Sequence, residues 1–328
     1  MKLAMALCTT VATFGQAVVV ERVFTFKNPK TFQQSRELGT CLRSIGDFKD
    51  LSVSDTDVTV KGSPGQLAFA EWAFSQLDIP PEPLIHSVSA DFPYDGNPQD
   101  VVRIFRAGHA TNVQAFQEMA TGIRSVNEIR RLFTYNLTRS IILRAKPGDL
   151  DASRWMFEQL DQASSDAKPQ TYTIPLPTSP NRLELANTIR ILRVSQPLNL
   201  QEFQATVTAV RRFTEIRRVY SYSPSKTIIA KGSSEMIDML SWLVGQLDQD
   251  SPSGSTLEYR VPAADDLVNI IFLPQNLPVS DFQAAATGIR TATGIQRIYT
   301  LDRLRAVLVR GAASEVAQVH QLLGDSKK

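Results

Sequence analysis

The feature that most constrains this chain is an internal repeat marked by its three tryptophans. Each tryptophan opens the same seven-residue frame, which ends in Gln-Leu-Asp, and the frames are spaced 83 and 87 residues apart. The frames are Trp72–Asp78, Trp155–Asp161 and Trp242–Asp248. Self-similarity at a fixed period is the signature of a repeat architecture, in which each repeat is one small structural unit. The chain is therefore predicted to be an array of units.

Two further patterns extend the repeat over the rest of the chain. An apolar-Arg pair recurs as Leu42-Arg43, Ile123-Arg124, Val210-Arg211 and Ile289-Arg290. A basic-small pair recurs as Lys61-Gly62, Arg144-Ala145, Lys231-Gly232 and Arg310-Gly311. Stretches rich in Pro, Ser and Asp near residues 79–83, 162–169 and 249–254 are typical of linkers. They delimit repeat 1 (18–80), repeat 2 (86–162), repeat 3 (170–250) and repeat 4 (256–326).

Hydrophobic periodicity predicts the order of elements within a repeat. In repeat 2 an apolar run at 101–105 precedes apolar residues at helical spacing from Val113 to Ile123. Two β-rich runs then precede a closing helix. Repeat 3 has the same order, with Ser233 or Ser234 as N-cap of its closing helix. The predicted fold class is α+β, a tandem array of four βαββα units, each a small sheet with two helices on one face.

An extended stretch also precedes repeats 2, 3 and 4. These stretches are Ser87–Phe92, Thr171–Leu176 and Leu257–Val261. Periodicity leaves two interpretations open, because such a stretch either adds an edge strand to its sheet or ties neighbouring repeats together.

The repeat resembles a known family. The βαββα order, the strand that ends in Val60-Lys61-Gly62 or Val309-Arg310-Gly311, and the helix that closes on Gln-Leu-Asp are similar to the short periplasmic N-domains of bacterial outer-membrane secretins. The likeness covers repeats 1 to 3 well and repeat 4 in part. It implies KH-like domains that act in series by protein–protein contact, without catalysis or a cofactor. The secretin pore module has no counterpart in these 328 residues.

The second strand of each repeat predicts a protein-binding surface. Alternation places Leu51, Leu132, Val219 and Ile298 on the face that meets the helices. Three strands covered by two helices are expected to leave the opposite face open, and in repeats 2 to 4 this face carries arginine and aromatic side chains, which are enriched in protein interfaces. The candidate residues are Arg131, Phe133, Tyr135, Arg218, Tyr220, Tyr222, Arg297 and Tyr299.

Other interpretations of this face stay open. Linkers or adjacent repeats could cover it, or its residues could be ordinary half-exposed strand residues of high β-propensity. Repeat 1 differs from the others, because its equivalent face is predicted to be a plain solvated surface. That face consists of Asp50, Ser52, Ser54, Thr59 and Lys61.

The tryptophans lie off the core stripe of their helices at 100° per residue, so each ring needs a second surface to cover it. The favoured cover is the first helix of the same repeat. The alternative is the following linker or the neighbouring repeat, which would fix the angle between repeats.

Composition argues against several function classes. Three histidines and two cysteines are too few and too scattered for a metal cluster or a disulfide framework, and no catalytic or cofactor-binding motif is present. A net charge of +2 makes nucleic acid an unlikely ligand by sequence. Gly62-Ser-Pro-Gly65 matches the GxxG loop of nucleic-acid-binding KH domains, but it is interpreted as the turn that caps a helix.

The N-terminus predicts export. Met1-Lys2 precede eighteen uncharged residues, and the small residues around Ala17 fit cleavage of a signal over residues 1–17. A membrane anchor or an ordinary first strand are the alternatives. The prediction is a non-enzymatic, periplasmic or otherwise exported interaction or scaffold protein, with no membrane span in the mature chain, no metal, no cofactor and no small-molecule substrate. Its partner would be an envelope assembly component or a second copy of itself. The alternative is a cytoplasmic nucleic-acid-binding array of KH-like units.

Overall fold

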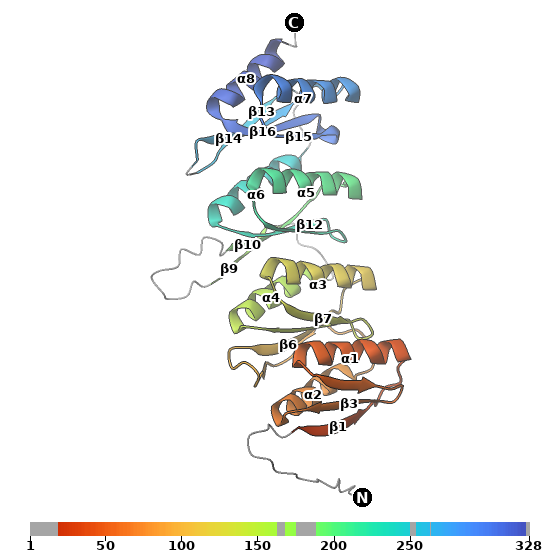
Figure 1. Ribbon diagram of the computed structural model, residues 1–328. Helices are drawn as coiled ribbons and strands as arrows, with labels where there is room; N and C mark the ends of the chain where they lie inside the picture. Colours follow the sequence, from red (N-terminus) through yellow and green to blue (C-terminus); the bar gives the residue numbers. More distant parts are fainter. Residues whose placement is uncertain (1–18, 163–167, 175–187, 250–253, 263, 326–328) are drawn as a thin grey trace, which may run out of the picture. The chain divides into compact units, whose positions relative to one another are not determined.

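The computed structural model describes residues 19–162, 168–174, 188–249, 254–262 and 264–325. Within them the chain forms eight α-helices and four small antiparallel sheets that alternate along the sequence (Figure 1). This is the α+β class that the periodicity predicts. None of the helices in these ranges has both the length and the apolar character needed to cross a bilayer. The predicted export signal, residues 1–17, lies outside the described residues.

Repeat 1 shows the motif in its simplest form. Its elements are β1 (Val20–Thr25), α1 (Phe32–Gly46), β2 (Asp50–Val53), β3 (Asp57–Gly62) and α2 (Pro64–Leu77). The third strand of the motif, β3, lies between β1 and β2 and is antiparallel to both. Both helices pack on the sheet face that carries Leu51, Val58 and Val60, and these residues are buried as predicted.

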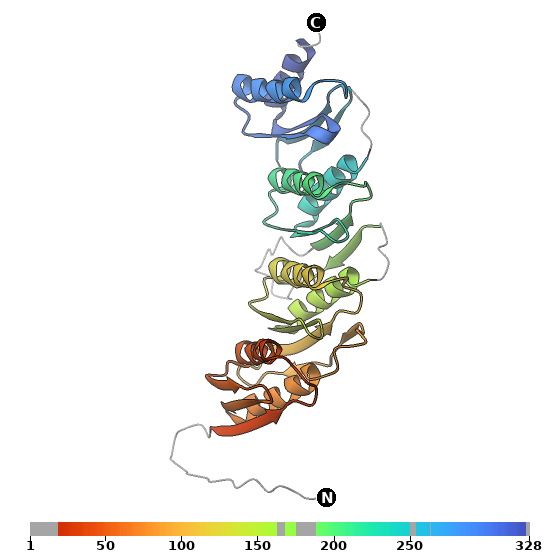
Figure 2. The same ribbon diagram turned by 90° about the vertical axis from the view of Figure 1, so that its right-hand side faces the viewer.

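Repeats 3 and 4 have the same order with one more strand. The elements of repeat 3 are β9 (Gln170–Thr173), β10 (Thr188–Arg193), α5 (Leu200–Thr214), β11 (Arg218–Tyr222), β12 (Thr227–Gly232) and α6 (Ser234–Leu247). Those of repeat 4 are β13 (Thr256–Arg260), β14 (Asp266–Phe272), α7 (Val279–Thr293), β15 (Arg297–Leu301), the 3₁₀ turn η1 (Asp302–Leu304), β16 (Ala306–Ala312) and α8 (Ala313–Asp325). Figure 2 shows α5 and α6 on one face of their sheet.

The added strands answer the question about the extended stretches. β9 pairs with β10, and β13 pairs with β14, so each stretch is an edge strand of its own repeat. Repeat 2 has two short edge strands. They are β4 (Ser87–Val88) and β5 (Phe92–Pro93), and both pair with β6 (Val101–Arg106). Its sheet continues through β8 (Ser140–Ala145) to β7 (Arg131–Tyr135), and its helices are α3 (Val113–Asn127) and α4 (Pro147–Leu160).

The helices begin where short polar side chains satisfy their first N–H groups. Ser233 caps α6 and accepts from the N–H of Met236, so it is Ser233 rather than Ser234 that forms the predicted cap. Ser63 caps α2 through a capping box with Gln66. The Gly62–Gly65 segment is therefore the cap turn that the sequence predicts.

The aspartate that ends each tryptophan frame ties the closing helix to the loop after the first strand. Asp161 accepts hydrogen bonds from the N–H groups of Gly108 and His109, both at 2.8 Å. Asp248 binds Ser195 and Gln196 in the same way. The repeated Gln-Leu-Asp motif is thus explained as a structural clamp.

Asp78 makes the same clamp in repeat 1 and adds a buried ion pair. It accepts from the N–H of Lys27 at 2.6 Å and pairs with Lys30, and both side chains of the pair are almost fully buried. Burial acts to raise the pKa of Asp78, but the hydrogen bonds from Lys30 and Lys27 outweigh it and lower the pKa overall.

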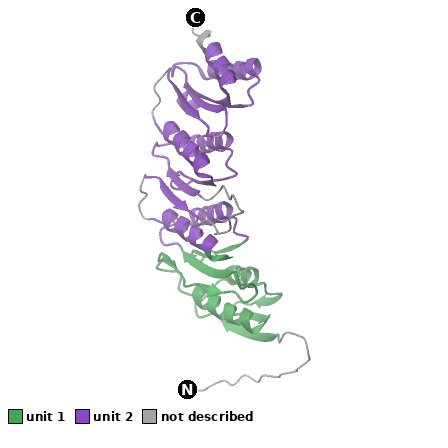
Figure 3. Cartoon of the chain, turned by 90° about the vertical axis from the view of Figure 1, so that its left-hand side faces the viewer, with its two compact units in different colours: residues 1–106, 131–147 green, residues 107–130, 148–328 purple. Residues whose placement is uncertain are grey.

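The chain divides into two compact units whose boundary cuts through repeat 2 (Figure 3). Unit 1 comprises residues 1–106 and 131–147, which are repeat 1 and the sheet of repeat 2. Unit 2 comprises residues 107–130 and 148–328, which are the helices of repeat 2 with repeats 3 and 4. Compact packing therefore does not follow the repeat borders.

Candidate protein-binding surface and the joints between repeats

The eight candidate residues lie on β7, β11 and β15, and in each case the first helix of the preceding repeat packs on these strands. In unit 1 α1 lies against β7, and in unit 2 α3 lies against β11 and α5 against β15 (Figures 1 and 2). We call these three contacts the first, second and third joint. The expectation that this sheet face is open is wrong for repeats 2 to 4. The alternative that an adjacent repeat covers it is the one the structure shows.

The physical reason lies in the third strand of each repeat. On the face that carries the candidates, this strand contributes Ile142, Ile229 and Leu308, all fully buried. A sheet with apolar residues on both faces needs a cover on both faces, as in buried parallel sheets. Binding of another protein through the eight candidates stays a prediction. The structure shows that the preceding repeat of the same chain packs on their strands.

At the first joint the candidate residues complete the hydrophobic core of repeat 1. Tyr135 and Ile142 are fully buried in the same cluster as Leu38, Leu42 and the rest of the repeat 1 core. Phe133 is partly buried against this cluster. Cys41 of α1 also lies in the joint, where its thiol contacts the carbonyl oxygen of Thr134 at 3.4 Å. The core of repeat 1 therefore extends into repeat 2.

The polar part of the first joint is a pair of arginines at the end of α1. Arg131 and Arg144 are directly opposite each other on β7 and β8, an arrangement that is destabilising for like charges. Asp47, the C-cap of α1, accepts from both, with N···O distances of 2.5 and 2.7 Å. The arginines also bind the carbonyl oxygens of Ser44 and Ile45. They satisfy carbonyls that the helix end leaves without partners.

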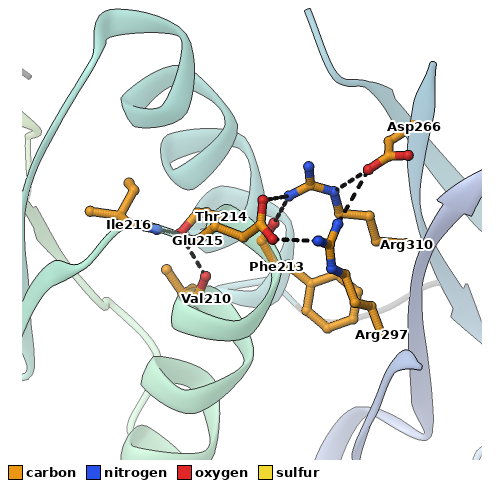
Figure 4. Close-up of polar contacts among 8 residues, drawn as sticks. All are labelled: Val210, Phe213, Thr214, Glu215, Ile216, Asp266, Arg297 and Arg310. Carbon is orange, nitrogen blue, oxygen red and sulfur yellow. Dashed lines mark hydrogen bonds and ion pairs between the residues drawn. The ribbon is translucent and has the colours of Figure 1, made fainter. Parts of the chain in front are cut away.

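The third joint repeats this arrangement (Figure 4). Arg297 and Arg310 are cross-strand neighbours on β15 and β16, and both pair with Glu215, the C-cap of α5. Arg310 donates to the carbonyl oxygen of Phe213 at 2.6 Å, and Asp266 of β14 accepts from it at 3.0 Å. Arg310 is only 7% exposed, so these partners compensate a buried charge.

The second joint uses one acidic cap and an aromatic contact. Glu128, the C-cap of α3, pairs with Arg218 at 2.5 Å. The ring of Tyr220 lies against Gly122, where a Cβ atom would come within 2.9 Å of it. Burial and the nearby carboxylate of Glu118 raise the pKa of Tyr220 to about 12, and the same two causes raise the pKa of Tyr222 to about 12.

The backbone of the three acidic caps is unusual. Asp47, Glu128 and Glu215 have φ values of 55°, 56° and 57°, in the left-handed region that normally selects glycine. The equivalent cap of α7 is Gly294, with φ 70°. A side chain in this region costs about 1 kcal/mol or more. The acids occur at the three caps that pair with arginines of the following repeat, whereas glycine occupies the cap of α7.

Repeat 1 has the open face that its sequence predicts. Ser52 and Lys61 are exposed, and Lys61 is opposite Asp50 on one side and Glu21 on the other. Lys61 pairs with Glu21 at 3.0 Å. The positive charge of Lys61 is therefore balanced by acidic residues of the same sheet.

The tryptophans form a second set of contacts between repeats. Trp72 stacks on Phe92 of β5, with ring centroids 5.0 Å apart. Trp155 packs on Tyr172 of β9 at 5.4 Å, and Trp242 packs on Tyr259 of β13 at 5.2 Å. The partner is in each case the edge strand of the next repeat. These ring contacts are the inter-repeat alternative, while cover by the first helix of the same repeat stays a prediction.

Two signals in the sequence mark the joints and were missed. The first is the acidic residue just after each first helix, and the second is the pair of basic residues in the second and third strands. Each looks like ordinary surface charge until the strand register places the two cations opposite each other. Register depends on pairing, which alternation within a single strand does not report.

Comparisons with known proteins give the following. No protein-family model matches the chain, and no curated protein matches it. Similar solved structures include Aeromonas hydrophila ExeD, at 10% identity over 70% of this chain and 41% of that one, with a TM-score of 0.17. Another is the N-terminal domain of the secretin XcpQ from Pseudomonas aeruginosa, at 14% identity over 70% of this chain and all of that one, with a TM-score of 0.23.

A third is the ETEC pilotin–secretin AspS-GspD complex, at 10% identity over 93% of this chain and 55% of the matched chain, with a TM-score of 0.17. The chain thus spans less than half the length of ExeD and about half of the chain matched in the AspS-GspD complex. TM-scores this low mean that the chains do not superimpose as wholes, so these likenesses say nothing about function.

Proposed function

We propose that this chain is a non-enzymatic interaction or scaffold protein that is exported and works in an envelope secretion or pilus assembly. The observation that carries the proposal is the use of one surface three times. The first helix of a repeat recognises the sheet of another repeat at every joint, with an acidic cap and an apolar stripe. The repeat is thus a module whose surfaces bind modules of the same kind.

The sequence supports export and a location in the cell envelope. The βαββα order and the Gln-Leu-Asp ending resemble secretin N-domains, which act by protein contact in the periplasm. The uncharged N-terminal stretch that ends near Ala17 is typical of an export signal. The same stretch favours an extracytoplasmic partner over nucleic acid.

Export is tested first. The full chain should be recovered from the periplasmic fraction with a mature N-terminus that begins close to residue 18. A chain without residues 2–17 serves as the matched control and should stay in the cytoplasm. Recovery of the uncleaved chain in the cytoplasm, bound to RNA or DNA, would contradict the proposal and restore the nucleic-acid alternative.

Interaction is tested by chemical cross-linking in the periplasm, followed by affinity capture and mass spectrometry. Components of an envelope secretion or pilus assembly should be enriched over the control that lacks the signal. A chain that is exported but captures no envelope protein, at a cross-linker level that captures known periplasmic complexes, would refute the scaffold role.

A further inference from the structure

The first two joints are closed by the same hydrogen bond. A glutamate in the middle of the first helix accepts from the backbone N–H at the start of the turn between the second and third strands. Glu37 accepts from the N–H of Asn136 at 3.0 Å, and Glu118 accepts from the N–H of Ser223 at 2.6 Å. In both joints the turn therefore lies directly against the helix.

The third joint lacks this contact. Counted from the start of the helix, the position of Glu37 and Glu118 is Ala205 in α5, and the turn position of Asn136 and Ser223 is Asp302. The structure has a cavity of about 490 Å³ at this place, lined by Ala205 and Asp302 among others. The cavity thus lies at the place where the other two joints have the glutamate and its hydrogen bond.

The cavity has an apolar floor and acidic walls. Leu301 and Leu304 line it and are buried, and the ring of Tyr299 also lines it. The carboxylates of Glu202 and Asp302 contribute two negative charges. The one cation in the lining, Arg303, already donates to the carbonyl oxygen of Leu247 at 2.8 Å. Next to the cavity, Leu200 at the start of α5 is 61% exposed.

We propose that this cavity binds an arginine or lysine side chain from a basic segment of a partner protein. The apolar floor would hold the aliphatic stem, and Asp302 and Glu202 would pair with the cationic end. The chain already stacks a guanidinium on a tyrosine ring, because Arg144 lies 4.1 Å from the ring centre of Tyr94. Tyr299 offers the same surface to an entering arginine. Exposed Leu200 favours an apolar residue beside the basic one.

An acidic partner fits the site poorly. At the first two joints the group that enters is a carboxylate, but there the turn residue is Asn or Ser. At the third joint a carboxylate would meet Asp302 and Glu202, and like charges repel. This inference rests on the proposed interaction function, and it adds a place on the chain and a partner chemistry to it.

The test grafts the closed joint onto the open one. The variant Ala205→Glu with Asp302→Ser copies the second joint and should fill the cavity without disturbing the fold. The probe is the capped peptide Leu-Arg-Leu-Arg-Leu, titrated into the full chain at low salt, with Leu-Glu-Leu-Glu-Leu as its acidic counterpart. The basic peptide should bind the native chain, and its affinity should fall by about tenfold or more in the graft. The acidic peptide should not bind.

Two further variants keep the outcome decisive. Asp302→Lys changes one exposed residue, so it should fold even if the graft does not, and it should abolish binding of the basic peptide. Asp281→Asn removes an exposed acid of α7 that does not line the cavity, and it should leave binding unchanged. No binding to the native chain, or equal binding to Asp302→Lys, overturns the proposal. If the graft or Asp302→Lys still captures the envelope partner in the cross-linking experiment, the proposed function stands and this site does not.

Discussion

The sheets of repeat 1 and repeat 4 share the order of their three common strands, but their faces balance charge in opposite ways. In repeat 1 the cross-strand pair is Asp50 with Lys61, and the face is open to solvent. In repeat 4 the pair is Arg297 with Arg310, and α5 covers the face with Glu215 between the two cations. Two like charges placed side by side raise the energy of a sheet unless an opposite charge arrives from elsewhere.

The difference teaches that the charges of the cross-strand pair at this position indicate whether a helix of another repeat covers the sheet. A pair of opposite sign is complete within its own repeat. A pair of equal sign needs an added negative charge, and the helix end of the preceding repeat supplies one carboxylate and one or two carbonyl oxygens. In repeat 4 Asp266 of the same sheet supplies a second carboxylate. The following experiments are designed to break or to sharpen this contrast.

The largest effect is expected from Tyr135, which is fully buried at the first joint. Tyr135→Ala should lower the free energy of unfolding of the chain by about 3–5 kcal/mol, because it leaves a cavity in the core of repeat 1. Ser52→Ala on the open face of repeat 1 should change it by less than about 0.5 kcal/mol. Chemical denaturation measures both, and equal small effects would show that the covered and open faces do not differ.

A companion variant separates the ring from its hydroxyl. The hydroxyl of Tyr135 is buried and has no hydrogen-bond partner among the described residues. Tyr135→Phe should therefore leave stability unchanged or raise it slightly, since burial of an unsatisfied polar group is unfavourable. A clear loss in this variant would mean that the hydroxyl is hydrogen-bonded.

The next effect is expected at the acidic cap. Glu215→Ala should cost about 1–2 kcal/mol, because buried Arg310 and its neighbour Arg297 lose a charge-assisted partner while Asp266 and the Phe213 carbonyl remain. The matched control is Asp50→Ala on the open face, which should cost less than about 0.5 kcal/mol. Thermal unfolding at low and high salt checks both variants, and the Glu215 effect should shrink as salt rises.

A smaller effect is expected between the tryptophans and the next edge strand. A double-mutant cycle of Trp242→Ala and Tyr259→Ala should give a coupling energy of about 0.5–1.5 kcal/mol, as for aromatic pairs in contact. A coupling near zero would indicate that something other than Tyr259 covers the ring, such as the first helix of the same repeat.

The last effect appears only in alkaline solution. Unfolded tyrosine ionises near pH 10, whereas burial beside Glu118 raises the pKa of Tyr220 and Tyr222 to about 12. Between these values the unfolded chain releases protons that the folded chain retains, so stability should fall as pH rises from about 10 to 12. Tyr220→Phe with Tyr222→Phe should reduce this fall. The face of repeat 1 carries no tyrosine, so it adds nothing to the tyrosinate absorbance. Ultraviolet titration of tyrosinate before and after denaturation checks the two pKa values.

Local patterns predicted the elements of the fold. The second and third strands alternate as expected, Ser233 caps α6, and repeat 1 has the solvated face that Ser52 and Lys61 indicated. These features depend on residues close together in sequence, where period and capping chemistry are decisive. The predicted inward residue Ile298 is likewise buried in the core of repeat 4, together with Val307 and Val309.

The covering of the faces was not predictable from one strand at a time. Ile142, Ile229 and Leu308 lie on the face that was expected to be open, and their apolar character was the available sign that something covers it. The identity of the cover depends on contacts between residues about 100 positions apart, such as Glu118 with Ser223 and Arg310 with Phe213. The cavity at the third joint is similarly hidden, because it arises from the absence of a glutamate at Ala205.

The shared core at the first joint also governs the order in which the chain is able to fold as it is made. Tyr135 and Ile142 belong to the core of repeat 1, yet they follow the last helix of that repeat by more than fifty residues. A nascent chain that has just finished α2 therefore holds an unfinished core with an apolar side exposed. Since synthesis delivers about 5–20 residues per second, this exposure lasts for seconds. The same delay recurs when repeat 3 waits for Leu301 and Leu308, so the cores of repeats 1 and 3 are completed only by the repeat that follows.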